Sequence, residues 1–240
     1  MANVMLEMDG VHSGYGKLHI LYDISYKFKE KYITVIVGPN GSGKSTLLKT
    51  IFGLTNIYTG KILFQGNDIT KKPAHDRAKM GIAYLPQTDN VFAQLTVAEN
   101  LKMASYTLDA ETARDRLEEV LARFPLLKER WNQKAGTLSG GQRQILAMGM
   151  ALMRRPTLMM FDEPTGALSP GLSKMILREI EKLRDELGIT IILVEQNAKI
   201  ALQMGDEAIL LVSGRMHYTG KALDLLNHPE LGKLYLGIKK

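Results

Sequence analysis

One stretch of the sequence decides the fold, and it reads Gly38-Pro39-Asn40-Gly41-Ser42-Gly43-Lys44-Ser45-Thr46. It fits the pattern G-x-x-x-x-G-K-[ST], in which a glycine-rich loop joins a strand to a helix. The apolar residues 32–37 predict the strand, and the helix is expected to begin near Lys44. Such a loop curls so that successive N–H groups, and the positive end of the helix dipole, face phosphate oxygens. We therefore predict a phosphate-binding loop, in which Lys44 reaches the β- and γ-phosphates of a nucleotide and Ser45 binds Mg²⁺.

An acidic pair, Asp162-Glu163, ends the apolar run at residues 157–161. In open α/β sheets, ligands bind at the carboxyl ends of the strands. We expect Asp162 to hold Mg²⁺ through water, and Glu163 to orient or deprotonate the water that attacks the γ-phosphorus. Acidic residues at a strand end are often only solvated, but the phosphate loop favours the catalytic interpretation.

The rest of the pattern predicts an α/β core. Short β-rich runs bounded by glycine or proline lie at residues 32–37, 61–64, 81–85, 157–161, 189–194 and 207–212. Several are continuously apolar, as buried parallel strands are. A helix over residues 172–187, which Gly188 ends, joins two of these strands and completes a βαβ unit.

Residues 88–152 interrupt this alternation. They contain no convincing strand and at least one amphipathic helix, whose apolar face consists of Leu117, Val120, Leu121 and Phe124. We therefore predict a single domain over residues 1–240, with a nucleotide-binding core of residues 1–87 and 153–240 and an inserted helical subdomain of residues 88–152. A length of 240 residues suits one domain with one insertion.

The composition is that of a globular protein, and it narrows the function classes. Hydrophobic residues make up 45% and charged residues 23% of the chain, which excludes a disordered protein. There is no cysteine, so disulfides, thiolate nucleophiles and cysteine metal sites are excluded and a reducing compartment is favoured. The formal charge is +6, but basic residues alternate with acids, as in residues 182–186, so no nucleic-acid partner is expected.

Attachment to a membrane is expected only through partner proteins. No run approaches the ~18 apolar residues that would span a bilayer. Glu7 and Asp9 stand where a secretory signal needs basic and then apolar residues. The expected location is the cytoplasm.

A third motif distinguishes between families of phosphate-loop proteins, and it reads Leu138-Ser139-Gly140-Gly141-Gln142. Ser139 is expected to cap a helix whose bare glycine backbone can grip a phosphate. In this order, after the phosphate loop and shortly before the acidic strand, the motif resembles the signature of the ATP-binding-cassette (ABC) ATPases. The resemblance covers essentially the whole chain. It implies a P-loop NTPase core of ABC type, with an N-terminal antiparallel β portion and the inserted helical subdomain.

The resemblance also implies roles for further residues. Tyr15 matches the aromatic residue on which adenine stacks, and Gln87 matches the glutamine that reaches Mg²⁺ and joins the core to the helical subdomain. In this family the signature of one subunit, here Ser139 to Gln142, closes over the ATP that the phosphate loop of the other holds. A head-to-tail dimer is implied, and a lone subunit should hydrolyse ATP poorly. Closure with ATP and reopening after hydrolysis drive the attached membrane subunits.

Three positions depart from the family pattern. Gln196 stands where most members have histidine, and its amide can donate to a γ-phosphate oxygen without titrating near neutral pH. We therefore expect Gln196 among the catalytic residues, with Lys44 and Glu163. Ser169 replaces an aspartate in the loop Leu168-Ser169-Pro170 that crosses between subunits, which is expected to loosen the coupling of the two sites. Met150 replaces an arginine of the signature helix.

Three segments resemble one subfamily, the shorter ATPase of the branched-chain amino acid importers. They are Val194-Glu195-Gln196-Asn197-Ala198, Pro73-Ala74-His75 and the ending Leu234-Tyr235-Leu236-Gly237. The subfamily implies a homodimer or a heterodimer with a related ATPase, membrane permease subunits and an extracytoplasmic solute-binding protein, on the inner face of the cell membrane. Glutamate often stands at the position of Gln87 in that subfamily. Glutamine is seen there in relatives that import urea or short amides, so both classes of solute stay open.

Other function classes fit the sequence less well. A GTP switch would need the guanine-reading pattern Asn-Lys-x-Asp, which the sequence lacks. A soluble cassette ATPase of repair or translation stays an alternative, although such chains usually fuse two cassettes or carry coiled-coil or zinc insertions. A regulatory binder without turnover is disfavoured by the joint presence of Lys44, Asp162 and Glu163. The sequence thus predicts a Mg²⁺-dependent ATPase subunit coupled to transport.

Overall fold

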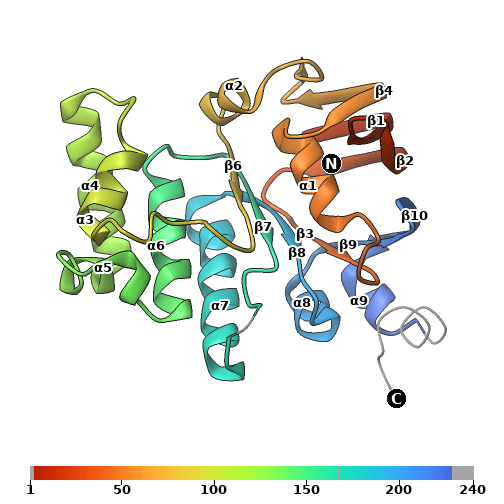
Figure 1. Cartoon of the computed structure of the whole chain (residues 1–240). Coiled ribbons are helices and arrows are strands. Elements are labelled where there is room, and N and C mark those ends of the chain that lie inside the picture. Colours follow the sequence, from red (N-terminus) through yellow and green to blue (C-terminus); the bar gives the residue numbers. More distant parts are fainter. Residues whose placement is uncertain (1–2, 167, 229–240) are drawn as a thin grey trace.

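The main sheet runs through the centre of the structure, a computed structural model that describes residues 3–166 and 168–228 (Figure 1). Its strands lie in the order β10 (Arg215–Lys221), β9 (Glu207–Val212), β3 (Ile33–Val37), β8 (Thr190–Val194), β7 (Leu158–Asp162) and β6 (Ile82–Leu85). Strands β9 to β6 are parallel, and β10 pairs antiparallel with β9. Every residue of β3, β7 and β8 is buried, as is usual for parallel strands covered on both faces.

Helices cover both faces of this sheet. They are α1 (Lys44–Phe52), α2 (Ala74–Lys79), α7 (Pro170–Leu187), α8 (Ala198–Met204) and α9 (Ala222–Leu226). The predicted βαβ unit is confirmed, because α7 joins β7 to β8 and these two strands pair in parallel. Helix α7 ends at Gly188 in a left-handed conformation with a φ of 65°, which glycine adopts without a steric penalty.

A second, antiparallel sheet confirms the N-terminal β portion. Its strands lie in the order β2 (Leu18–Lys29), β1 (Val4–Tyr15), β4 (Asn56–Phe64) and β5 (Asn67–Asp68). The run predicted at residues 61–64 is the end of β4. Helix α1 lies between the two sheets (Figure 1), since its Leu47 and Leu48 share a buried cluster with Phe64 of β4 and Ile36 of β3. Apolar contacts therefore hold the helix that follows the phosphate loop on two sides.

Between β6 and β7, in a stretch described throughout, the chain forms helices and no strand (left of Figure 1). The helices are α3 (Val97–Ala104), α4 (Ala110–Arg123), α5 (Pro125–Glu129), the 3₁₀ helix η1 (Ala135–Thr137) and α6 (Gly140–Leu152). The predicted apolar face lies on α4 and just after it. Val120 and Phe124 are buried, and Leu117 and Leu121 pack against the same core.

Within residues 3–166 and 168–228, no helix is long and apolar enough to cross a bilayer. The ending Leu234-Tyr235-Leu236-Gly237, one of the segments that indicate the subfamily, lies outside the described residues.

Candidate active site

The loop between β3 and α1 has a backbone that only glycine can form at Gly38. A Cβ atom there would lie 2.0 Å from the carbonyl oxygen of Leu211. Helix α1 begins without a side-chain cap, since its N-cap residue is Gly43. The first N–H groups of a helix have no acceptor within the helix, and the Oγ of Ser42 is buried without a partner. This curled loop with open donors fits a phosphate group.

Lys44 lies folded into this loop. Its Nζ donates to the carbonyl oxygens of Gly38 and Pro39, both at 3.0 Å. Burial lowers the pKa of Lys44, and the carboxylates of Glu163 and Asp162 partly oppose that shift. The ammonium is thus already positioned beside the loop before any nucleotide contact.

Ser45 and Asp162 meet although the sequence separates them widely. The Oγ of Ser45 donates to Oδ1 of Asp162 at 2.9 Å, and the hydroxyl of Tyr84 donates to Oδ2 at 3.0 Å. Within the described residues no three His, Cys, Asp or Glu side chains group as metal ligands. A hydroxyl and a carboxylate suit Mg²⁺, which keeps water and phosphate oxygens as its other ligands. Tyr84 was not predicted from the sequence.

Glu163 sits in a strained backbone position beside this pair. Its φ is 49°, which costs a residue other than glycine about 1–3 kcal/mol. Its N–H donates to the carbonyl oxygen of Val194 at 2.9 Å. The amide of Gln87 donates to Oε2 of Glu163 at 3.0 Å. Gln87 therefore contacts the candidate base, and its contact with Mg²⁺ stays a prediction.

Gln196 and Glu163 meet at one small cavity. The cavity has a volume of about 250 Å³, and both residues line it. Gln196 is exposed in the turn after β8, so its amide is available to a ligand. Glu195, the buried residue before it, was not predicted as a site residue, although it follows a continuously apolar strand just as the acidic pair does.

Tyr15 ends β1 and is 39% exposed, so its ring has a free face for a base. The turn after it is fastened to β4. Asn56 Oδ1 accepts from the N–H of Gly16 at 2.9 Å, and the hydroxyl of Tyr58 donates to the Gly16 carbonyl at 2.9 Å. These contacts fix the backbone turn that follows Tyr15.

The signature lies at the start of α6, and the predicted helix cap is confirmed. Ser139 Oγ accepts from the N–H of Gln142 at 3.3 Å, and Gln142 Oε1 accepts from the N–H of Ser139 at 2.9 Å, which is a capping box. A Cβ on Gly140 would lie 2.6 Å from Cδ2 of Leu168, and one on Gly141 would lie 3.3 Å from Cδ2 of Leu172. The signature therefore packs against the start of α7 and the loop before it.

Two other residues that depart from the family pattern, Ser169 and Met150, lie just before helix α7 and on helix α6, respectively. Ser169 is the N-cap residue of α7, but its side chain makes no cap hydrogen bond. Met150, on α6, is partly buried against the core. It contributes packing where the family pattern has a guanidinium.

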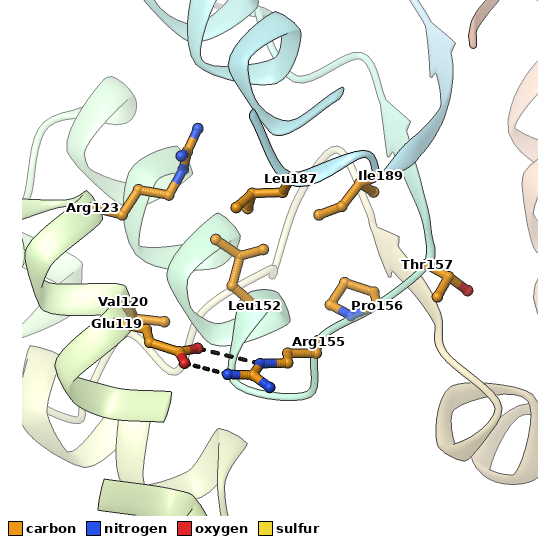
Figure 2. A pocket seen from close by; sticks show the side chains of 9 residues that line it. All are labelled: Glu119, Val120, Arg123, Leu152, Arg155, Pro156, Thr157, Leu187 and Ile189. Carbon is orange, nitrogen blue, oxygen red and sulfur yellow. Dashed lines mark hydrogen bonds and ion pairs between the residues drawn. The ribbon is translucent and has the colours of Figure 1, made fainter. Parts of the chain in front are cut away.

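A larger cavity of about 570 Å³ lies apart from these residues, and Figure 2 shows its lining. Its walls come from α4, from the end of α6 and from the residues around α7 and β8, and an ion pair between Glu119 and Arg155 closes one side. None of the predicted site residues lines it. Its size therefore does not mark the active site.

Comparisons with known proteins agree with this geometry. The sequence model of the ABC transporter family matches residues 21–166. A protein of Archaeoglobus fulgidus named "Probable branched-chain amino acid transport ATP-binding protein LivF" is 53% identical over 234 residues, which cover 98% of this chain and 99% of that protein. The "High-affinity branched-chain amino acid transport ATP-binding protein BraG" of Pseudomonas aeruginosa is 43% identical over 97% of this chain and all of its own length.

Solved structures share the fold. An ATP-binding cassette of an ABC transporter in its ADP conformation has a TM-score of 0.87 and 27% identity, over 96% of this chain and 98% of that one. A dimeric cassette in a post-hydrolysis state, bound to ADP and phosphate, has a TM-score of 0.78 and 27% identity, over 91% and 99% of the two chains. The chain therefore belongs to the ABC transporter family, as an ATP-binding cassette.

Proposed function

We propose that this cassette hydrolyses ATP to power a membrane importer of branched-chain amino acids. The observation that supports hydrolysis most directly is the 2.9 Å hydrogen bond between Ser45 and Asp162. It joins the phosphate loop to the acidic strand, so the groups that bind a phosphate and those that activate water lie at one edge of the sheet.

The phosphate loop binds the nucleotide in this proposal. N–H groups of residues 40–46 surround the phosphates, Lys44 leaves the loop carbonyls to contact the β- and γ-phosphates, and Tyr15 stacks on adenine. Ser45 and Asp162 would hold Mg²⁺, with Gln87 as a further ligand. When bound, the metal neutralises charge that develops on the phosphate oxygens.

Glu163 and Gln196 serve the chemical step. Glu163 takes a proton from the attacking water, and the amide of Gln87 holds its carboxylate in place through Oε2. Gln196, which lines the same cavity, donates to a γ-phosphate oxygen. Because the glutamine amide does not titrate, this contact supplies orientation and no proton.

The working unit in this proposal is a head-to-tail dimer. Residues Ser139, Gly140, Gly141 and Gln142 of one chain close over the nucleotide of the other. The mate is a second copy or a related ATPase. The cassette is a single domain, which consists of a core of residues 1–87 and 153–240 and a helical subdomain of residues 88–152. Permease subunits hold it on the cytoplasmic face of the membrane. The dimeric form of a related cassette supports this arrangement.

The relatives support branched-chain amino acids as the solute, since both carry that solute in their names. A second candidate, urea or a short amide, rests on Gln87, where the branched-chain subfamily often has glutamate. In the importer, a solute-binding protein outside the membrane would select between them.

Hydrolysis is tested by the rate of phosphate release from ATP and Mg²⁺. Glu163→Gln should lose more than about 99% of turnover, because the amide cannot accept the proton of water. Glu118→Gln, the same change at an exposed position of α4, should keep the wild-type rate. Equal rates in Glu163→Gln and wild type would exclude Glu163 as the base.

The solute is tested with the complete importer in vesicles. ATP-dependent uptake of leucine without uptake of urea is the expected result. Uptake of urea alone would favour the second candidate and would leave the ATPase assignment intact.

A further inference from the structure

The side chain of Glu195 is an unusual feature of the turn after β8. It is a carboxylate that is only 3% exposed. Burial raises its pKa, and hydrogen bonds from Thr165, Gln196 and Asn197 partly oppose that shift. Among the described residues no Lys, Arg or His forms an ion pair with it. A buried carboxylate without a counter-ion costs stability unless its oxygens are hydrogen-bonded. The hydrogen bonds that its two oxygens accept are therefore what allow a glutamate at this position.

Glu195 links two loops that leave neighbouring strands. Its Oε1 accepts from the N–H of Thr165 at 3.1 Å, and its Oε2 accepts from the N–H of Gln196 at 3.1 Å. Thr165 lies two residues after Glu163 in the loop that follows β7. One carboxylate thus joins the loop of the candidate base to the turn of the candidate γ-phosphate donor.

A backbone hydrogen bond also links the candidate base to the end of β8. The N–H of Glu163 donates to the carbonyl of Val194, and the N–H of Gly166 turns back to the carbonyl of Glu163 itself. Glu163, Glu195 and Gln196 all line the cavity of about 250 Å³ between the loops. In the proposed function, Glu163 and Gln196 both act at one γ-phosphate, so the spacing of their loops matters.

We infer that Glu195 is a positioning residue that fixes the spacing between Glu163 and Gln196 by accepting one N–H group from each of their loops. The inference rests on the proposed roles of those two residues. A carboxylate can accept at both oxygens, whereas an amide of the same shape accepts at its oxygen and presents a donor at its nitrogen. Replacing Glu195 by glutamine therefore breaks one of the two ties and preserves the packing.

The alternative is that Glu195 only braces the fold. The two roles predict different outcomes for Glu195→Gln. If Glu195 is only a brace, removal of the buried charge opposes the loss of one hydrogen bond, and any fall in kcat should match a fall in the folded fraction. If the carboxylate sets the catalytic spacing, kcat should fall while the folded fraction stays that of the wild type. Burial raises the pKa of Glu195, so its ionised form destabilises the folded state. The free energy of unfolding of the wild type should therefore fall as the pH rises through that pKa, whereas that of Glu195→Gln should not.

The experiment compares Glu195→Gln and Glu195→Ala with wild type in steady-state ATPase kinetics and in urea unfolding. We expect kcat to fall about tenfold in the glutamine variant and about a hundredfold in the alanine variant, as one or both ties are lost. The KM for ATP should stay within about twofold, because Tyr15 and the phosphate loop are not touched. The urea midpoint of Glu195→Gln at neutral pH should be no lower than that of wild type.

Glu207→Gln is the matched control. Glu207 is also a hydrogen-bonded glutamate, held by Tyr26 and Lys29, but it starts β9 and contacts neither loop. Its substitution should leave kcat unchanged. A wild-type kcat in Glu195→Gln would overturn the inference, as would a loss in Glu195→Ala that matches its unfolded fraction. Wild-type hydrolysis that depends on Glu163, measured in the same assay, would show that the proposed function still holds in that case.

Discussion

Helices α1 and α6 begin in different ways, although both N-termini are assigned to a phosphate. The N-cap of α1 is Gly43, and no side chain caps the helix. The N-cap of α6 is Ser139, whose capping box with Gln142 already satisfies N–H groups within the chain. The first helix is open to a ligand before one arrives, and at the second a phosphate has to compete with a side chain.

This difference indicates which helix can bind a phosphate without a second chain. Helix α1 has its loop, its lysine and its open donors on a single chain, so the lone chain should bind nucleotide. In the proposed dimer, helix α6 meets a phosphate only when another chain presents one. The contrast gives a physical reason why a lone cassette should hydrolyse ATP poorly while still binding it.

The largest expected effect tests the open helix, by a substitution at Gly38. In Gly38→Ala the new methyl group would overlap the Leu211 carbonyl at 2.0 Å, so the loop cannot keep its curl and nucleotide affinity should fall by more than about a hundredfold. Gly41→Ala is the control. That residue has a φ of 76° but open space around a Cβ, so only strain of about 1–2 kcal/mol applies. Titration of a fluorescent nucleotide measures both, and equal losses would contradict the account.

An intermediate effect is expected at the capped helix from Gln142→Glu. Glutamate completes a capping box well and favours the positive end of the helix, so the lone chain should be as stable as wild type or slightly more stable. The added charge repels the γ-phosphate of a partner chain, so ATP-dependent association should weaken about tenfold. Gln142→Ala loses the cap without adding charge. If the glutamate variant associates as wild type does, Gln142 does not face that phosphate.

The smallest effect concerns the cap itself and comes from Ser139→Ala. The loss of an N-cap hydroxyl should lower the free energy of unfolding by about 1 kcal/mol, as measured by urea denaturation. Thr96→Ala is the matched control, because Thr96 and Glu99 form the same capping box at α3. Both variants should lose similar stability, and only Ser139→Ala should also slow turnover. A loss of nucleotide affinity in the lone Ser139→Ala chain would contradict the conclusion that α1 binds nucleotide independently of α6.

Sequence patterns predicted the parts of the fold that are local. The phosphate loop, the buried strands and the amphipathic helices follow from contiguous residues. Strand β1 was not predicted, because bulges near Gly10 interrupt its alternation of apolar and polar residues. Strand β10 was not predicted either, because it is an edge strand with no fully buried residue. Only the family resemblance led us to expect an antiparallel sheet at the N-terminus.

The parts of the site that depend on contacts between strands were not predicted. Tyr84 contacts Asp162 on the neighbouring strand, and Glu195 contacts Thr165 in the loop after that strand, and no spacing within one segment reveals such pairs. A retrospective signal exists for Glu195, which follows an apolar strand as Asp162 ends one. The roles assigned to the predicted site residues remain proposals that the variants above test.

The central claim is that one nucleotide is held between α1 of one chain and α6 of another. It is tested by sedimentation of two variants that both carry Glu163→Gln to prevent hydrolysis. One also carries Lys44→Ala, and the other also carries Ser139→Arg. With ATP and Mg²⁺, each alone should stay monomeric, whereas their mixture should form a dimer with one ATP, because only the mixture contains one intact pair. A mixture that stays monomeric, or a Ser139→Arg chain that dimerises alone, would contradict the account.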